Sequence, residues 1–224
     1  MTYFIKLASA EDVADIAKIT NEEARRSTAT VASSSEPIAE WITSFQNDLD
    51  KAPWLVAMAP LRSRVAEERE YEVIGYAKGS QYNSRDGFKW SMALSIYIKP
   101  EWKGKKVGEN LYSVLFQLMK TQGVHNVYAR IALPNPASQR LHSRFGLIQT
   151  GLLPKFAWKF GTWHDMAIYT GCIGSTAEAS PSDLVGVKEA WDKNFGEVHL
   201  AFEELLPSLP ASEASSVLSY GEDR

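Results

Sequence analysis

The stretch WKGKKVGENLY, residues 102–112, lies between an apolar run and a segment with helical periodicity. The preceding run, WSMALSIYI at 90–98, predicts a strand that ends before Pro100. From Val107 onward, apolar residues recur every three or four positions, which predicts a helix. A glycine-bearing turn between a strand and a helix directs unpaired backbone N–H groups and the positive end of the helix dipole at one spot. The stretch is therefore a candidate phosphate site, with an exposed lysine-rich turn as the alternative.

Two kinds of residue in this loop favour phosphate binding. Gly104 and Gly108 allow close backbone approach, while Lys103, Lys105 and Lys106 add mobile positive charge. A single loop of this type is a weak signal, because solvated turns share its composition. The surrounding sequence has to decide between the two interpretations.

The rest of the chain predicts elements in the order β, α, α, β, β, β, α, β, α, β, β. Ser9 and Asp12 form a capping-box-like start for the first helix, and Gly146 ends the last. Residues 60–70 form a charged connection that we interpret as a solvated hairpin loop. We expect strands over 3–7, 54–59, 71–80, 90–98, 124–133, 147–153 and 156–171, and helices over 9–25, 37–49, from 107, and around 137–145.

Composition indicates one well-packed domain with an appendage, although two small domains would also fit 224 residues. The single cysteine, Cys172, excludes an intramolecular disulfide and a cysteine-built metal site, and the four scattered histidines give metal chemistry no support. The N-terminus reaches charged residues too early for a secretory signal, and no apolar run is long enough to span a bilayer. We expect a soluble cytoplasmic protein without a membrane partner.

Charge is distributed unevenly between the body and the tail. Residues 173–224 contain ten acidic and three basic side chains, whereas residues 1–172 contain 21 basic and 17 acidic ones. This small basic surplus is not concentrated on one element, so we expect no nucleic-acid partner; it suits a small polyanionic cofactor. After residue 171 the composition predicts a linker at 175–182 and an amphipathic helix from Leu184 to Leu205, weakened by Gly186 and Gly196. We expect this helix to pack on the body or across a dimer, and the Ser-rich acidic end to be disordered.

The loop and the element order together resemble the GNAT acetyltransferases. That family has Gln/Arg-x-x-Gly-x-Gly/Ala in this loop, and residues 103–108 match it with Lys106 in place of the middle glycine. Further on, LPNPASQRLHSRFGL at 133–147 resembles the second acetyl-CoA motif of the family. Two motifs in the order that the family has are much stronger evidence for this resemblance than one motif alone.

Within that family, the chain is similar to the phosphinothricin and methionine sulfoximine N-acetyltransferases over about residues 3–170, in segments such as PWLVA, LPNPASQRLH and GTWHDMAIY. The resemblance implies an α/β (α+β) GNAT fold: a mixed, mostly antiparallel central sheet flanked by helices and splayed near its centre. It implies a GNAT domain at 1–171, followed by the linker, helix and tail at 172–224. It also implies acetyl-CoA as co-substrate without a metal, a small-molecule amine as acceptor, and a homodimer.

The resemblance also assigns the site. The pantetheine arm should add along Ile96, Tyr97 and Ile98, and the pyrophosphate should lie on backbone N–H groups of the loop. Lys106 can still contribute its N–H there provided its φ is not forced positive. His142 is the implied catalytic residue. The implied cofactor-binding residues are Ile96, Tyr97, Ile98, Lys103, Gly104, Lys105, Lys106, Val107, Gly108 and Asn135, and the implied substrate-binding residues are Thr28, Arg85, Ala93 and Ser95.

The chain departs from the branch at the position of the expected base. Ala93 stands where that branch has a glutamate, and the segment 90–98 contains no carboxylate. Ser91, Ser95, a water chain or His142 then remains to take the proton. Arg85 suits an amino-acid carboxylate, with a solvated loop arginine as the alternative. We interpret WHD at 163–165 as structural or dimer-related rather than as a catalytic His-Asp pair, because adjacent residues on a strand point to opposite faces.

Two functions are compatible with these residues. The first is acetyl-CoA-dependent acetylation of the α-amino group of a small amino acid or glutamate-like analogue, with detoxification as its purpose. The second is a catalytically weak acetyl-CoA-binding regulatory protein. Ala93 separates the two, because it removes the expected base from an otherwise complete pattern.

Overall fold

The computed structural model describes residues 2–61, 70–174, 180–196 and 200–201. Their strands form one sheet in the order β6-β7-β5-β4-β3-β2-β1-β8. Among these strands only β4 and β5 run parallel, so the predicted mixed, mostly antiparallel sheet is confirmed. The strands are β1 (Phe4–Leu7), β2 (Trp54–Pro60), β3 (Tyr71–Gln81), β4 (Ser91–Ile98), β5 (Asn126–Ala132), β6 (Ile148–Lys159), β7 (Thr162–Cys172) and β8 (Leu200–Ala201).

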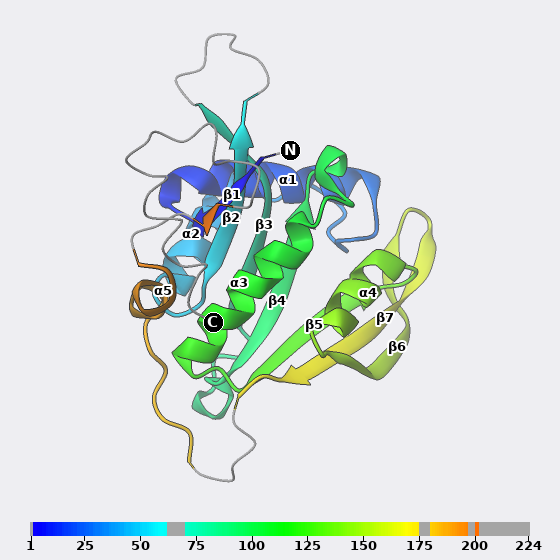
Figure 1. The fold of residues 1–224 in the computed structure, drawn as a ribbon. Coiled ribbons are helices and arrows are strands. Elements are labelled where there is room, and N and C mark those ends of the chain that lie inside the picture. The colour runs from blue at the N-terminus through cyan, green and yellow to red at the C-terminus, as the bar shows by residue number, and fades with distance from the viewer. Residues whose placement is uncertain (1, 62–69, 175–179, 197–199, 202–224) are drawn as a thin grey trace.

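Helices cover both faces of the sheet (Figure 1). One face carries α1 (Val13–Arg26) and α2 (Ile38–Asp48), and the other carries α3 (Val107–Gln122), α4 (Pro136–Arg144) and α5 (Val187–Phe195). Each face has its own core, because helices and strands bury one apolar side each. Leu111 and Leu115 of α3 are fully buried in one core, while Trp41 of α2 and Tyr76 of β3 pack in the other.

The order of elements through β7 matches the sequence prediction. Ser9 and Asp12 form the expected capping box, in which the Ser9 N–H donates to Asp12 Oδ2 at 2.7 Å. Three short 3-10 turns were not predicted, at Ala10–Asp12, Asp86–Phe88 and Pro100–Trp102. The predicted loop at 60–70 falls mostly outside the described residues.

The sheet opens between β4 and β5, as expected. In the described strands the pairing runs only from Ser91 with Asn126 to Ala93 with Tyr128. Beyond Ala93 the two strands separate, and Figure 1 shows them diverging from a common start. The rest of β4 therefore lacks β5 as a neighbour, although it stays paired to β3 on its other edge.

The boundary between the last two strands was predicted wrongly. It was expected near Pro154, whereas β6 runs through this residue to Lys159 and turns at Phe160 and Gly161. Pro154 lies in an irregular stretch where the pairing register shifts between Leu153 and Ala157. A strand tolerates proline at such a bulge, because the ladder hydrogen bond is already interrupted.

The tail helix is shorter than predicted, and glycines mark both its ends. α5 follows Gly186 and stops before Gly196, which has a φ of 60°. Ala190 and Trp191 are buried in the same core as α3, and the Gln122 side chain donates to the Val185 carbonyl at 3.1 Å. Packing on the body was one of the two expected arrangements. Leu205 and the Ser-rich end lie outside the described residues.

Candidate active site

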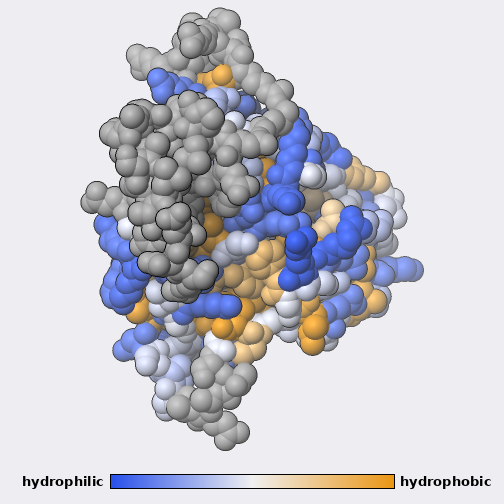
Figure 2. All heavy atoms as spheres, viewed as in Figure 1, coloured by the Kyte–Doolittle hydropathy of each residue, from blue (hydrophilic) through white to orange (hydrophobic). Residues whose placement is uncertain are grey.

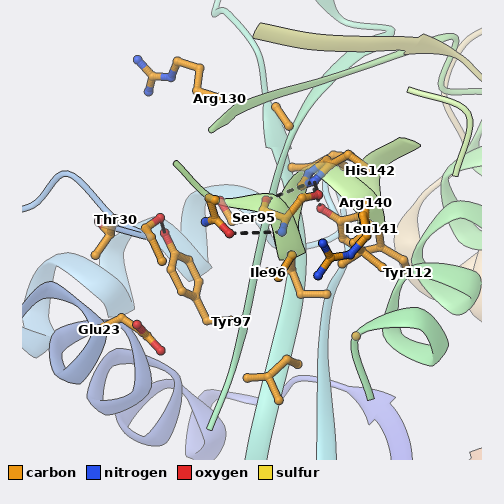
Figure 3. Close-up of a pocket in the computed structure, with 18 of the residues that line it drawn as sticks. Glu23, Thr30, Ser95, Ile96, Tyr97, Tyr112, Arg130, Arg140, Leu141 and His142 are labelled. Carbon is orange, nitrogen blue, oxygen red and sulfur yellow. Dashed lines mark hydrogen bonds between the residues drawn. The ribbon is translucent and has the colours of Figure 1, made fainter. Parts of the chain in front are cut away.

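A cavity of about 750 Å³ occupies the opening between β4 and β5 (Figure 3). Its walls come from β4, β5, the N-terminus of α3, the inner side of α4 and the connection between α1 and α2. The structure brings these sequence-predicted residues to its lining: Ala93, Ser95, Ile96, Tyr97, Ile98, Lys103, Gly104, Lys106, Val107, Gly108, Asn135 and His142.

Three predicted residues do not line this cavity. Arg85 is exposed in the connection between β3 and β4, and its backbone N–H donates to Asn83 at 3.0 Å. Lys105 lies with its ammonium 5.1 Å from the centre of the Trp102 ring. Thr28 is half-buried beside the cavity, and its neighbours Ala29 and Thr30 line it instead. The segment around Arg85 contributes no residue to the lining, whereas the segments around Thr28 and Lys105 contribute neighbouring residues.

The cofactor side of the cavity is a free strand edge facing a helix N-terminus. Ile96 and Ile98 point toward α3, because alternate residues of a strand share a face. A Cβ atom added to Gly108 would make ordinary van der Waals contacts, at 3.6 Å, with both Ile96 and Leu141, so the first turn of α3 lies close to β4 and α4 here. The backbone of β4 beyond Ala93 is thus exposed to the cavity, where an extended amide chain can add as a further strand.

The loop before α3 differs from expectation in two ways. Lys106 has a φ of +62°, a left-handed conformation that favours glycine. The expected contribution of its N–H to a phosphate site required a φ that is not positive, and this requirement is not met. The Lys103 N–H donates to the Pro100 carbonyl at 3.2 Å and is not available to a phosphate. The N–H groups of Val107, Gly108 and Glu109 have no acceptor within their own helix. The candidate phosphate site is therefore the first turn of α3. Hydrophilic residues gather over this part of the helix and over α4 (Figure 2).

Lys103 belongs to a charge cluster around a buried carboxylate, although its own side chain is exposed. Its ammonium lies 2.8 Å from Glu23, whose side chain is only 1% exposed. Arg26 and Ser27 also donate to the Glu23 carboxylate. Burial raises the pKa of Glu23, but the hydrogen bonds from Arg26, Lys103 and Ser27 outweigh it and lower the pKa to about 2. Glu23 is thus ionised at the cavity wall, and one of the loop lysines is already paired.

His142 is buried and has a defined tautomer. Its Nδ1 lies 2.8 Å from the Ser138 carbonyl, which can only accept, so Nδ1 carries the hydrogen. Its Nε2 lies 2.9 Å from the Tyr112 hydroxyl, and this hydroxyl therefore donates to Nε2. Burial lowers the pKa of His142, which keeps the ring neutral. Tyr112, the last residue of the stretch 102–112, also lines the cavity, and the sequence alone did not single it out.

The opposite side of the cavity carries a different set of residues. Ala93, Ser95 and Tyr97 share the face of β4 that points toward α1 and α2, and Tyr128 and Arg130 share the same face of β5. Figure 3 shows Tyr97 and Thr30 together on this side, away from His142. We name it the acceptor face: Thr30, Ala93, Ser95, Tyr97, Tyr128 and Arg130.

One further residue was missed because it acts across a long sequence separation. Lys159 is 4% exposed and donates to the carbonyls of Ser27 and Thr30, each at 2.7 Å, which fixes the connection between α1 and α2 against β6. His164 and Asp165 have structural contacts, as expected: His164 Nε2 lies 3.1 Å from the Lys159 carbonyl, and Asp165 accepts from the Lys155 N–H at 2.7 Å.

The described ranges hold neither a metal centre nor a membrane-spanning helix. There, no three His, Cys, Asp or Glu side chains converge on a possible metal site. The helices α1 to α5 are all too short or too polar to cross a bilayer.

Comparison with known proteins agrees with this geometry. Residues 5–168 match the model of the acetyltransferase (GNAT) domain family. A phosphinothricin N-acetyltransferase from Streptomyces viridochromogenes is 31% identical over 165 residues, which are 74% of this chain and 85% of that protein. One from Streptomyces coelicolor is 37% identical over 124 residues, covering 54% of this chain and 72% of that protein.

Solved structures give the same result. A phosphinothricin acetyltransferase of the GNAT superfamily from Sinorhizobium meliloti, in complex with acetyl-CoA, superposes with a TM-score of 0.73 at 29% identity, covering 83% of this chain and 96% of that one. A putative acetyltransferase from Salmonella typhimurium with its cofactor acetyl-CoA gives 0.70 at 28% identity, covering 80% and 98%. The opened sheet with a helix N-terminus at its edge, together with these matches, identifies the chain as an acetyl-CoA-dependent transferase. This chain belongs to the GNAT acetyltransferase family.

Proposed function

We propose that the protein is an acetyl-CoA-dependent N-acetyltransferase that acetylates the α-amino group of a small amino acid or glutamate-like analogue. Similarity to phosphinothricin N-acetyltransferases supports this class of acceptor, and chemical detoxification is the proposed purpose. The observation that carries the proposal is the cavity itself. It joins a free β4 edge and the first turn of α3 on one side to a separate acceptor face on the other.

The reaction forms a bond between the amine nitrogen and the acetyl carbon, and it breaks the bond from that carbon to sulfur. The amine must first lose a proton, and the sulfur leaves as a thiolate that later takes one up. Two carboxylates line the cavity, Glu23 and Glu109. Both are ion-paired, Glu23 with Lys103 and Glu109 with Arg144 at 2.9 Å, and a pKa of about 2 makes Glu23 a poor proton acceptor.

We therefore propose that water removes the proton from the acceptor amine. Ala93 offers no proton acceptor, while the hydroxyl-bearing residues Ser95 and Thr30 on the acceptor face can order a short water chain. The free-amine fraction of the substrate then limits the rate, so activity rises with pH toward the pKa of that amine. A base within the enzyme would give a plateau near neutral pH instead.

We propose that Tyr112 and His142 together stabilise the negative charge that develops on the departing sulfur. In the tautomer fixed by Ser138, His142 Nε2 carries no hydrogen and cannot donate one. The Tyr112 hydroxyl can turn its hydrogen from Nε2 toward the sulfur, which stabilises the charge that develops there. Burial raises the pKa of Tyr112 far above its ordinary value, so this phenol stays protonated and the thiol takes its proton from water.

We further propose that the protein is a cytoplasmic homodimer. Exposed apolar side chains on β6, β7 and their turn support pairing of two copies, because large exposed apolar patches mark contact surfaces. Trp158 and Trp163 pack together there, with ring centres 5.3 Å apart. The exposed residues are Ile148, Leu152, Phe156, Trp158, Phe160 and Trp163.

The experiment that tests the proposed function is an assay of thiol release. The full chain is incubated with acetyl-CoA and a panel of amino acids that includes phosphinothricin and methionine sulfoximine. We expect amine-dependent release of CoA, with at least one carboxylate-bearing acceptor. Tight binding of acetyl-CoA without release in the presence of any amine would favour the regulatory binding protein instead.

A further inference from the structure

We propose that Arg130 binds the carboxylate of the acceptor and selects for acceptors that carry one. This inference rests on the proposed function, and it assigns to Arg130 the role that the sequence suggested for Arg85. Arg130 lines the cavity from β5, whereas Arg85 does not line it.

The charges along the cavity wall single out this residue. Four of its seven charged side chains form ion pairs, Lys103 with Glu23 and Arg144 with Glu109. Within the part of the chain that the structure describes, the other three are cations without a recorded ion pair: Lys106, Arg130 and Arg140. An anionic group of a ligand can therefore bind any of the three without breaking an existing pair.

The three cations divide between the two sides of the cavity. Lys106 lies at the first turn of α3 and Arg140 on α4 beside His142, so both serve the cofactor side. Arg130 shares the face of β5 on which Tyr128 lies. In Figure 3 its side chain lies apart from the other labelled side chains, and its exposed guanidinium points away from His142. Among the described residues, Arg130 is thus the cation without a recorded ion pair on the acceptor face.

Arg130 also lies at the right depth in the opened sheet. The last paired residues of the two strands are Ala93 and Tyr128, and Arg130 follows Tyr128 by two positions. At about 3.3 Å per residue, its backbone is about 7 Å past the last pair, on the same face as Tyr128. That position faces Ser95 across the gap, where an acceptor amine must approach the acetyl group.

Guanidinium chemistry determines which group binds there. The planar fork of arginine pairs with a carboxylate through two parallel hydrogen bonds. Burial raises the pKa of Tyr128 while the nearby Arg130 charge opposes that rise, so this guanidinium already influences its neighbour on the face. An acceptor with a free α-carboxylate satisfies the arginine, whereas the corresponding amide leaves its charge unpaired.

The test compares acceptors that differ only at this group. L-methionine sulfone and its α-amide are assayed with the wild type, Arg130→Gln, Arg130→Lys and Arg85→Gln. We expect Arg130→Gln to lower the carboxylate-to-amide ratio of kcat/KM by about 10- to 100-fold, the range of one charged hydrogen-bonded pair. Arg130→Lys should give an intermediate ratio, because it keeps the charge and loses the fork. Acetyl-CoA affinity, measured by calorimetry, should be the same in all four proteins.

The outcomes separate this inference from the proposed function. If Arg130→Gln leaves the carboxylate-to-amide ratio of kcat/KM unchanged, or if this ratio falls in Arg85→Gln instead, the role of Arg130 is overturned. The proposed acetyl transfer is not affected by either result. If the wild type turns over no acceptor, the proposed function fails, and binding of the two probes to the CoA-loaded protein is followed by ligand-observed NMR. Preferential binding of the carboxylate that is lost in Arg130→Gln still supports the inference, and no preference in the wild type overturns it.

Discussion

Lys106 offers a direct test of the loop geometry, because its backbone and its charge can be changed separately. Its φ of +62° costs a side-chain-bearing residue about 1–2 kcal/mol relative to the right-handed region, whereas glycine adopts this conformation freely. Glycine also gains freedom in the unfolded chain, which costs about 0.4–1 kcal/mol of stability. Lys106→Gly should therefore be more stable than Lys106→Ala by about 0.5–1 kcal/mol.

The matched control is the neighbouring position. Lys105 is exposed like Lys106, but its φ is not positive, so Lys105→Gly should be less stable than Lys105→Ala. Thermal unfolding of the four variants measures both differences. The gain at Lys106 should raise the melting temperature of Lys106→Gly by about 1–4 °C over Lys106→Ala. Both Lys106 variants lose the same charge, so they should weaken acetyl-CoA binding equally. A glycine that is no more stable than alanine at position 106 would refute the assigned backbone conformation.

Other predictions concern the base, the leaving group, the buried carboxylate and the dimer. Ala93→Glu should shift the pH–rate profile to lower pH, because it restores a base on the acceptor face; an unshifted profile would count against that position. His142→Ala should reduce kcat more than acetyl-CoA affinity, and an equal loss of both would indicate a binding role. The lowered pKa of Glu23 means that its carboxylate stabilises the fold above its unfolded pKa and loses this effect as pH falls toward about 2. At neutral pH the free energy of unfolding of the wild type should thus exceed that of Glu23→Gln by about 3 kcal/mol. Denaturant titrations should show this difference shrinking between about pH 4.5 and 2, and a difference that does not depend on pH would contradict the charge cluster. Trp158→Glu should give a monomer by light scattering, and a wild-type monomer would remove the dimer proposal.

Local patterns predicted the elements that carry the cofactor side. The change from strand alternation at 90–98 to helical spacing after Val107, with glycines between, indicated a candidate phosphate site before any resemblance was used, with a solvated turn as the alternative. The opening of the sheet followed from the resemblance alone, since no spacing rule reports where two parallel strands separate. Pro154 gave a wrong strand boundary because a bulge and a strand end share the same residue signal.

The charge cluster and the acceptor face depend on contacts that sequence spacing does not reveal. Glu23 and Lys103 are 80 positions apart and meet only because α1 packs beside the end of β4. The orientation of Arg130 depends on which face of β5 borders the cavity, which requires the register with β4. The exchange of Arg85 for Arg130 as the candidate carboxylate ligand therefore came from the fold rather than from either motif.

Identification of the reaction products by mass spectrometry tests the proposed acetyl transfer itself. The full chain is incubated with acetyl-CoA and phosphinothricin or methionine sulfoximine, and free CoA and acetylated amine are quantified together. We predict equal amounts of the two products, with the acetyl group on the α-nitrogen and a rate that rises with pH toward the pKa of the amine. Bound acetyl-CoA with no acetylated product from these or any other amino acid would contradict the proposed function.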